Sequence, residues 1–203
     1  MDVSRAIGVL GGTFDPVHYG HLAAAQEAAM VLSLDRVLFL PANDPPHKRD
    51  EPVTAAANRA AMVRLAIADN PLFEICEIEL ERPGPSYTVD SLRTLHARLP
   101  DIEIYFIVGM DSLADLPTWH DPMGILELAC IAAIYRPGSK PVDLKIMAKE
   151  VPGAESRVRL IATPGLDIAS TDLRARLRDG NRPVRYLLPD AVIEYIEANG
   201  LYR

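Results

Sequence analysis

The sequence predicts an α/β protein with a Rossmann-like, doubly wound parallel sheet, and three observations point to this fold class. Short apolar runs alternate with helical patterns along nearly the whole chain, as in parallel sheets covered by helices on both faces. A glycine-rich turn joins the first apolar run to a helical pattern, and open parallel sheets bind nucleotides at such crossings. The chain has 203 residues, which suffice for a full core. We therefore expect a single domain over residues 1–203.

Six apolar runs have the length and composition of buried strands. They are Ala6–Leu10, Arg36–Leu40, Phe73–Leu80, Glu103–Val108, Ile131–Tyr135 and Arg157–Ala162. Seven segments between and after them are typical of helices. These are Gly20–Leu32, Thr54–Ala68, Thr88–Leu99, Pro122–Ala129, Asp143–Lys149, Thr171–Asp179 and Asp190–Asn199. The proline-rich stretch Pro41–Lys48 predicts a loop, because regular structure resumes soon after it.

The composition excludes several classes of function. The net charge is −7 and the isoelectric point is about 5.2, without a lysine and arginine cluster of the size that nucleic-acid binding needs. No stretch has the roughly 18 apolar residues of a membrane span, and Met1–Arg5 lacks the basic lead of a signal peptide. We expect a cytoplasmic protein without nucleic-acid or membrane partners. Cys76 and Cys130 lie in apolar runs and are expected to be buried thiols.

The most informative motif is GGTFDPVHYGH at residues 11–21, between the first predicted strand and the first predicted helix. Glycines let backbone N–H groups approach phosphate oxygens closely. The start of a helix adds a partial positive charge that faces the same oxygens. His18 and His21 lie three residues apart and are expected on one side of the helix. The motif therefore predicts a phosphate site.

Two imidazoles beside a phosphate cradle suit nucleotidyl or phosphoryl transfer, which depends on positioning and charge stabilisation more than on covalent chemistry. The motif is not a Walker-type P-loop, because it carries no lysine, and it is not GxGxxG. Two other roles are open to His18 and His21. One is a zinc pair, for which the sequence offers no complete ligand set. The other is capping of the helix, which leaves the preceding Gly-Gly-Thr unexplained.

The run TFDPVHYGH resembles the [ST]-[FW]-[DN]-P-x-H-x-G-H signature of the HxGH nucleotidyltransferase superfamily. The resemblance implies a Rossmann-like sheet of the nucleotidyltransferase type and in-line attack on an α-phosphorus, with pyrophosphate leaving. It implies that Mg²⁺ is carried on the ATP phosphates, so no protein ligand of a metal is expected. The residues that it assigns to ATP binding are Gly11, Gly12, Thr13, Phe14, His18 and His21, of which the two histidines are catalytic.

The loop after the second predicted strand carries P-x-N-x-P-P-H-K. Its charge alone indicates that Lys48 is part of a solvated basic loop. The pattern, however, resembles the nicotinate mononucleotide adenylyltransferases, and this resemblance implies that Asn43, His47 and Lys48 line the mononucleotide site. Two prolines stiffen the approach of His47 and Lys48.

A second helix start follows the segment ERPGPSYTVDSL at residues 81–92. Ser86 or Thr88 is expected to supply the N-cap. The free N–H groups of a helix start suit an anion such as a pyridine carboxylate. The segment resembles R-x-G-x-S-Y-T-x-D-T-L of the same adenylyltransferases, which implies that the nicotinate carboxylate binds the N–H groups of Tyr87 and Thr88. Ser91 stands where threonine is more usual.

Three further residues follow strand ends or a loop. The pattern G-x-D-(x)₇-W at Gly109, Asp111 and Trp119 resembles the same family, in which the aspartate contacts substrate and the tryptophan stacks near nicotinate. Asp111 could instead be the N-cap of a short helix, and Trp119 could be a packing anchor. Arg136 matches the basic residue that the family carries before Pro-Gly.

The last motif, Asp167–Arg174, opens a helix that Ser170 or Thr171 is expected to cap. It resembles I-S-S-T-x-I-R, in which Ser and Arg hold the β- and γ-phosphates of ATP. Ser170, Thr171 and Arg174 are therefore assigned to ATP. Ala169 replaces the first serine of that pattern and removes one hydroxyl.

Together the motifs imply transfer of AMP from ATP to nicotinate mononucleotide, giving nicotinate adenine dinucleotide and pyrophosphate in NAD biosynthesis. Two alternatives remain: a sister adenylyltransferase that accepts nicotinamide mononucleotide or phosphopantetheine, and a nucleotide-binding module without catalysis. The sequence leaves open the degree of preference for nicotinate and the oligomeric state, for which a homo-oligomer is one option.

Overall fold

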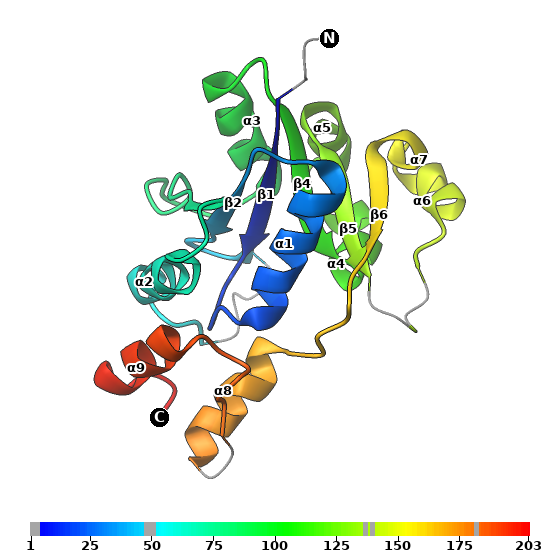
Figure 1. Cartoon of the computed structure of the whole chain (residues 1–203). Coiled ribbons are helices and arrows are strands. Elements are labelled where there is room, and N and C mark those ends of the chain that lie inside the picture. The colour runs from blue at the N-terminus through cyan, green and yellow to red at the C-terminus, as the bar shows by residue number, and fades with distance from the viewer. Residues whose placement is uncertain (1–4, 47–51, 136–137, 139–140, 181–182) are drawn as a thin grey trace.

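The structure is a computed structural model. It describes residues 5–46, 52–135, 138, 141–180 and 183–203. Its six strands form one parallel sheet in the order β3-β2-β1-β4-β5-β6 (Figure 1). The strands are β1 (Ala6–Gly12), β2 (Arg36–Pro41), β3 (Phe73–Ile75), β4 (Glu103–Gly109), β5 (Cys130–Tyr135) and β6 (Val158–Ala162). This order is that of a doubly wound Rossmann sheet, so the predicted fold class is confirmed.

Helices connect the strands and follow the last one. They are α1 (Tyr19–Leu32), α2 (Ala56–Ile67), α3 (Thr88–Arg98), α4 (Met110–Ala114), the 3₁₀ turn η2 (Leu116–Thr118), α5 (Pro122–Leu128), α6 (Leu144–Glu150), α7 (Ala154–Arg157), α8 (Ser170–Asp179) and α9 (Asp190–Ala198). All seven predicted helices are present to within two residues at each end. The short segments α4, η2 and α7 were not among the seven predicted helices, because segments of five, three and four residues are too short to show a helical period.

The third predicted strand was too long. Phe73–Leu80 was expected, but β3 ends at Ile75. The Cys76 N–H still donates to the Phe39 carbonyl at 2.8 Å, and the chain then turns, with the Leu80 N–H bonded to the Glu77 carbonyl at 2.9 Å. The edge strand therefore stops where the chain must leave the sheet, although its alternating pattern continues.

The sheet separates two apolar cores. Val37 and Phe39 on β2 face one core, and their neighbours Leu38 and Leu40 face the other. The first core receives buried side chains from α1, α2, α8 and α9, and the second from α3, α4, α5, α6 and α7. Alternate residues of buried parallel strands point to opposite faces, so both faces of the sheet are covered.

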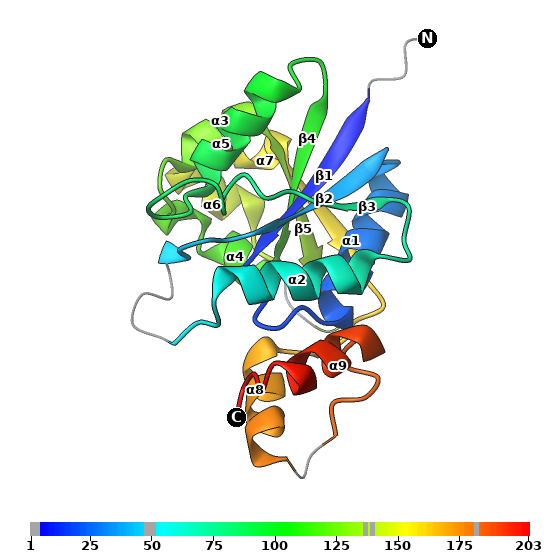
Figure 2. The same cartoon turned by 90° about the vertical axis from the view of Figure 1, so that its left-hand side faces the viewer.

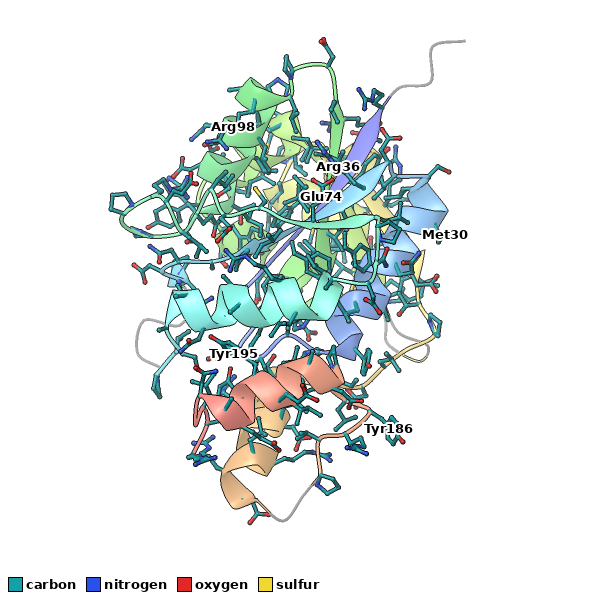
Figure 3. The ribbon with its side chains drawn as sticks, turned by 60° about the vertical axis from the view of Figure 1, so that its left-hand side comes forward. Met30, Arg36, Glu74, Arg98, Tyr186 and Tyr195 are labelled. Atoms are coloured by element: carbon teal, nitrogen blue, oxygen red, sulfur yellow. The ribbon has the colours of Figure 1, made fainter. Side chains whose placement is uncertain are left out.

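The helices α8 and α9 lie beyond the carboxyl ends of the strands, with α2 between α9 and the sheet (Figures 1 and 2). The Tyr195 hydroxyl on α9 donates to Asn58 Oδ1 on α2 at 3.0 Å (Figure 3). On the side of α2 that faces away from α9, an ion pair joins two neighbouring strands: Arg36 of β2 lies 3.2 Å from Glu74 of β3 (Figure 3). The C-terminal helices are thus joined to the edge at which an open α/β sheet binds ligands.

Two sequence expectations concern single features of the fold. Both cysteines are free thiols, with Cys130 buried as expected and Cys76 only half-buried, because it follows β3 at the sheet edge. Among the described residues, no helix is both long and apolar enough to cross a bilayer.

Candidate active site

A cavity of about 870 Å³ opens at the carboxyl ends of β1 and β4. Strand order reverses between these two strands, and the crevice at such a reversal is where open α/β sheets bind ligands. The volume lies in the usual range for small-molecule sites. One side of the cavity is formed by the motif after β1 and by the start of α8. The other is formed by the starts of α3 and α4 and by Trp119 and His120, which follow η2.

His18 and His21 stand together at the start of α1 and line the cavity. His18 is the N-cap residue of the helix, and His21 Nδ1 accepts a hydrogen bond from the His18 backbone N–H at 3.2 Å. The two rings stack with centroids 3.7 Å apart. The predicted juxtaposition is therefore confirmed, and the capping role weighed for these residues is also present.

The His21 contact fixes its chemistry. Because Nδ1 accepts a bond, the neutral ring carries its proton on Nε2 and can donate it. Burial lowers the pKa of His21 well below its ordinary value, and the neighbouring His18 lowers it further. At neutral pH the ring is thus an uncharged donor and a poor base.

The glycine between the histidines is required by their packing. A Cβ atom on Gly20 would lie 2.9 Å from His18 Nδ1 and 3.0 Å from its Cε1. A methyl group there would push the His18 ring off His21. A Cβ on Gly11 would similarly lie 2.9 Å from the Phe106 ring, so this glycine lets β1 pass close to β4.

The Phe14 side chain packs against the His21 ring of the histidine pair. It has a φ of 50°, in the left-handed region, and its ring is 2% exposed. The ring meets His21 edge-on at 5.1 Å and Phe39 at 5.8 Å. Gly11, Gly12 and Thr13 line the cavity, but the Phe14 ring is buried behind them. Phe14 can therefore contact a ligand in the cavity only through its backbone.

Aromatic side chains form the opposite side. The Tyr87 ring lies 4.4 Å from the His120 ring at an angle of 30°. Trp119 meets Phe106 edge-on at 6.1 Å and is partly buried, so it is both a packing anchor and a wall of the cavity. A flat ligand ring could stack on this group.

The expected capping of α3 was wrong. Tyr87 occupies the N-cap position without a side-chain cap. Ser86 cannot cap the helix, because its Oγ accepts the Asn43 and Asp44 N–H groups at 3.0 and 3.3 Å. The Tyr87 N–H donates to the Pro85 carbonyl at 3.0 Å, and Thr88 is the first helical residue and lines the cavity.

Asp111 and Gly109 lie where they were expected, at the carboxyl end of β4. Both line the cavity, and Asp111 is exposed. Gly109 is the N-cap residue of α4, so the alternative role of Asp111 as this cap is wrong.

Asn43 has a different role from the expected one. Its Nδ2 donates to the Arg82 carbonyl at 3.3 Å, and its backbone N–H donates to Ser86. It joins two loops instead of facing the cavity, whose lining includes its neighbours Ala42 and Pro45. His47, Lys48 and Arg136 lie outside the described residues.

The start of α8 is bonded to the motif after β1. The Ser170 hydroxyl donates to the Pro16 carbonyl at 3.0 Å, and Arg174 Nη1 donates to the Asp15 carbonyl at 2.8 Å. Ser170 and Thr171 line the cavity. The expected cap by Ser170 or Thr171 was wrong, because Ala169 holds the N-cap position and has no hydroxyl to offer.

Sequence reasoning missed Glu79 and His120, which both line the cavity. Glu79 is 5% exposed and accepts a hydrogen bond from the Ser91 hydroxyl. Burial raises the pKa of the Glu79 carboxyl, and the hydrogen bonds from Ser91 and Ser86 offset part of this rise. The His120 ring packs against the Tyr87 ring at a tilt of 30°. Neither belongs to a spacing pattern that singles it out; the only signal is that each stands close to a recognised motif.

No group of three or more His, Cys, Asp or Glu residues that could hold a metal ion occurs in the described ranges.

Comparison with known proteins agrees with this geometry. The sequence profile of the family described as cytidylyltransferase-like matches residues 9–176, which include both histidines and the start of α8. The chain belongs to the cytidylyltransferase-like family.

Two relatives of this cytidylyltransferase-like protein match over almost their whole length. A protein of Roseiflexus sp. (strain RS-1), named "Probable nicotinate-nucleotide adenylyltransferase", is 52% identical over 98% of this chain and 99% of its own. A protein of Thermomicrobium roseum with the same name is 49% identical over 97% of this chain and 91% of its own.

Solved structures show the same fold. Plasmodium falciparum nicotinic acid mononucleotide adenylyltransferase, complexed with NaAD, superimposes with a TM-score of 0.78 at 22% identity. The alignment covers 98% of this chain and 97% of that one. A second structure of the same enzyme, complexed with APC, gives a TM-score of 0.76 at 23% identity, with the same coverage of both chains.

Proposed function

We propose that the protein transfers the adenylyl group of MgATP to the phosphate of nicotinate mononucleotide, forming nicotinate adenine dinucleotide and pyrophosphate in NAD biosynthesis. The observation that carries the proposal is the division of one cavity into two sides. A stacked histidine pair at a helix start forms one side, and an aromatic cluster beside a second helix start forms the other. Relatives about half identical over their full length bear the corresponding name.

In this reaction an oxygen of the acceptor phosphate attacks the α-phosphorus of ATP. The new oxygen–phosphorus bond forms as the bond to the oxygen that bridges the α- and β-phosphates breaks, and that oxygen leaves with pyrophosphate. The acceptor phosphate is largely ionised at pH 7, because its second pKa is about 6. No general base is required.

His18 and His21 stabilise the charge that moves toward pyrophosphate. Neutral His21, with its proton on Nε2, is a preformed donor that needs no reorganisation during the reaction. Gly11, Gly12, Thr13 and the Phe14 backbone would approach the phosphates, with the start of α1 adding its partial positive charge.

Ser170, Thr171 and Arg174 would hold the outer phosphates of ATP from α8. In the ligand-free structure Arg174 Nη1 is bonded to Asp15, which uses one of five guanidinium N–H groups. Mg²⁺ would be carried by the triphosphate as part of the substrate.

On the acceptor side, the start of α3 suits the nicotinate carboxylate. The Thr88 N–H belongs to the first helical turn, where amides lack an intrahelical partner. The Tyr87 N–H would exchange its bond to the Pro85 carbonyl for the carboxylate. Trp119 and Tyr87 would face the pyridine ring, and Asp111 and Gly109 the ribose. For His47, Lys48 and Arg136 the assignment to the mononucleotide rests on the family resemblance alone.

Three broader predictions complete the proposal. The chain acts as a single nucleotidyltransferase domain, since two cores share one sheet. It uses Mg²⁺ with ATP. It works in the cytoplasm, without nucleic-acid or membrane partners.

The direct test follows the oxygen atoms. Purified protein is incubated with MgATP and nicotinate mononucleotide whose phosphate carries ¹⁸O, and products are identified by mass spectrometry. We expect all label in the dinucleotide and none in pyrophosphate, because the acceptor oxygen is the nucleophile. Product formed only with phosphopantetheine would favour the sister enzyme. Nucleotide binding without product from any acceptor would favour the non-catalytic module.

A further inference from the structure

The largest fully buried side chain in the described part of the molecule is a cation. Arg59, on the inner face of α2, is 1% exposed. Arginine is almost never fully buried unless it is paired or hydrogen-bonded. Nothing in its sequence surroundings, an alanine-rich helix, distinguishes it from a surface residue.

The guanidinium group bonds to three backbone carbonyls. Nε donates to Thr54 at 2.7 Å, Nη1 to Thr13 at 2.6 Å and Nη2 to Asn43 at 3.2 Å. Thr13 follows β1 and Asn43 follows β2, two adjacent strands of the sheet. One planar group, carried by α2, therefore joins the segments that leave these strands.

Neighbouring groups balance the charge of Arg59 only in part. Burial lowers its pKa, while Asp15, Tyr202 and Glu79 act in the opposite direction. The Asp15 carboxylate belongs to the motif after β1, and Glu79 lines the cavity. The cation thus carries a smaller desolvation penalty than an isolated charge would.

Both backbone polar groups of Asn43 are hydrogen-bonded to side chains. Its carbonyl accepts from Arg59, and its N–H donates to Ser86 Oγ at 3.0 Å. The segment after β2 consequently has little freedom to move relative to the segment after β1, where Thr13 stands.

We infer that Arg59 is a positioning residue, which sets the distance between the phosphate-binding segment after β1 and the mononucleotide-binding segment after β2. The inference rests on the proposed function, in which these segments hold the two reactants. A fork of three charge-assisted hydrogen bonds is stiff. In-line attack is sensitive to displacements of about 1 Å, which cost on the order of 100-fold in rate.

The test compares Arg59→Lys with Arg157→Lys. Arg157 is a matched control, because its Nε also donates to a backbone carbonyl, that of Leu126, at 2.8 Å, outside the cavity. Lysine keeps the charge but cannot reproduce the fork. We expect Arg59→Lys to lower kcat by about 10- to 100-fold, with the KM for MgATP within about threefold, and Arg157→Lys to leave kcat unchanged. The kinetics are measured at a temperature well below the Tm of both proteins. Equal kcat values for Arg59→Lys and the wild type at that temperature would overturn the inference.

A second readout needs no turnover and separates this inference from the proposed function. Hydrogen exchange is measured on the ligand-free variants by mass spectrometry. In Arg59→Lys the segments around residues 12–14 and 42–44 should lose protection together, while in Arg157→Lys neither should. Loss in one segment alone would contradict a link between them. If the wild type lacked activity but the paired loss occurred, the function would fail and the link would stand.

If Arg59→Lys does not fold, Ser86→Ala loosens the same Asn43 peptide from its amide side. We expect the Ser86→Ala variant to have a lower kcat, with a smaller fold-change in the KM for MgATP. We also expect faster hydrogen exchange at residues 42–44. Unchanged kcat and unchanged exchange would count against the inference.

Discussion

His21 is held as a neutral donor by burial and by two contacts with His18. The His18 N–H occupies its Nδ1, and the stacked His18 ring disfavours a positive charge. The sequence predicted that the two histidines would lie on one side, because the i,i+3 spacing places them there. It could not predict the tautomer, which depends on the rotamer that Gly20 and Phe14 permit.

Replacement of His21 by alanine should affect the transition state more than the ground state. We expect kcat to fall by about 100-fold, since loss of one preorganised donor commonly costs that much, and the KM for MgATP to change by a few-fold at most. Steady-state kinetics measures both values. His96→Ala, an exposed histidine on α3, is the control. An unchanged kcat in the His21→Ala variant would remove His21 from the reaction.

The lowered pKa of His21 also predicts the pH dependence of stability. In the folded protein the pKa lies below its unfolded value of about 6.5. The unfolded chain therefore binds more protons below that pH, and the stability present above pH 6.5 is lost as the pH falls toward the folded pKa.

Denaturant titrations of wild type and His21→Asn measure this loss between pH 7.5 and 5.5. We expect the wild type to lose more stability than the variant, with a difference of up to about 1.4 kcal/mol per pH unit. Parallel curves for the two proteins would show that His21 does not take up a proton in this range.

At the scale of elements, short motifs predicted where helices begin but not which residue caps them. Tyr87 and Ala169 hold the N-cap positions for which hydroxyl residues were expected. Just before α3, the hydroxyl of Ser86 accepts a hydrogen bond from the N–H of Asn43, 43 positions away in sequence. The truncation of β3 has a similar origin, since Glu79 beyond it bonds to Ser91 on α3. Local patterns do not contain such non-local contacts.

The missing cap on α8 makes Ala169→Ser a stabilising change. Ala169 has φ −122° and ψ 133°, the extended geometry in which a serine hydroxyl reaches the amides of the first turn. We expect a gain of about 1 kcal/mol in the free energy of unfolding. Ala175→Ser adds the same hydroxyl at an exposed site within α8 and should destabilise slightly. A loss of stability in Ala169→Ser equal to that in Ala175→Ser would contradict the capping assignment.

Across the whole molecule, the C-terminus supports the motif near the N-terminus. The Tyr202 hydroxyl donates to Asp15 Oδ1 at 2.6 Å, and the Thr54 N–H donates to Oδ2 at 3.2 Å. Asp15 is 3% exposed, so its carboxylate depends on these donors. The parallel sheet and its doubly wound class were predictable from alternating apolar runs, whereas this contact over 187 positions was not.

Tyr202→Phe should therefore destabilise the protein by about 2 kcal/mol, because hydrogen bonds to buried charged groups are worth that much. Chemical denaturation gives the value. Tyr186→Phe removes a hydroxyl from a side chain that is 84% exposed (Figure 3) and should change stability by less than about 0.5 kcal/mol. Equal effects of the two changes would show that the Asp15 contact contributes nothing.

The proposed acceptor is tested most directly by the rate of pyrophosphate release with MgATP and either nicotinate or nicotinamide mononucleotide. We expect turnover to be much faster with the nicotinate form, because only its carboxylate can bind the amides at the start of α3. Equal rates would keep adenylyl transfer and remove the carboxylate site at Tyr87 and Thr88. Absence of pyrophosphate release with both acceptors would contradict the proposed function.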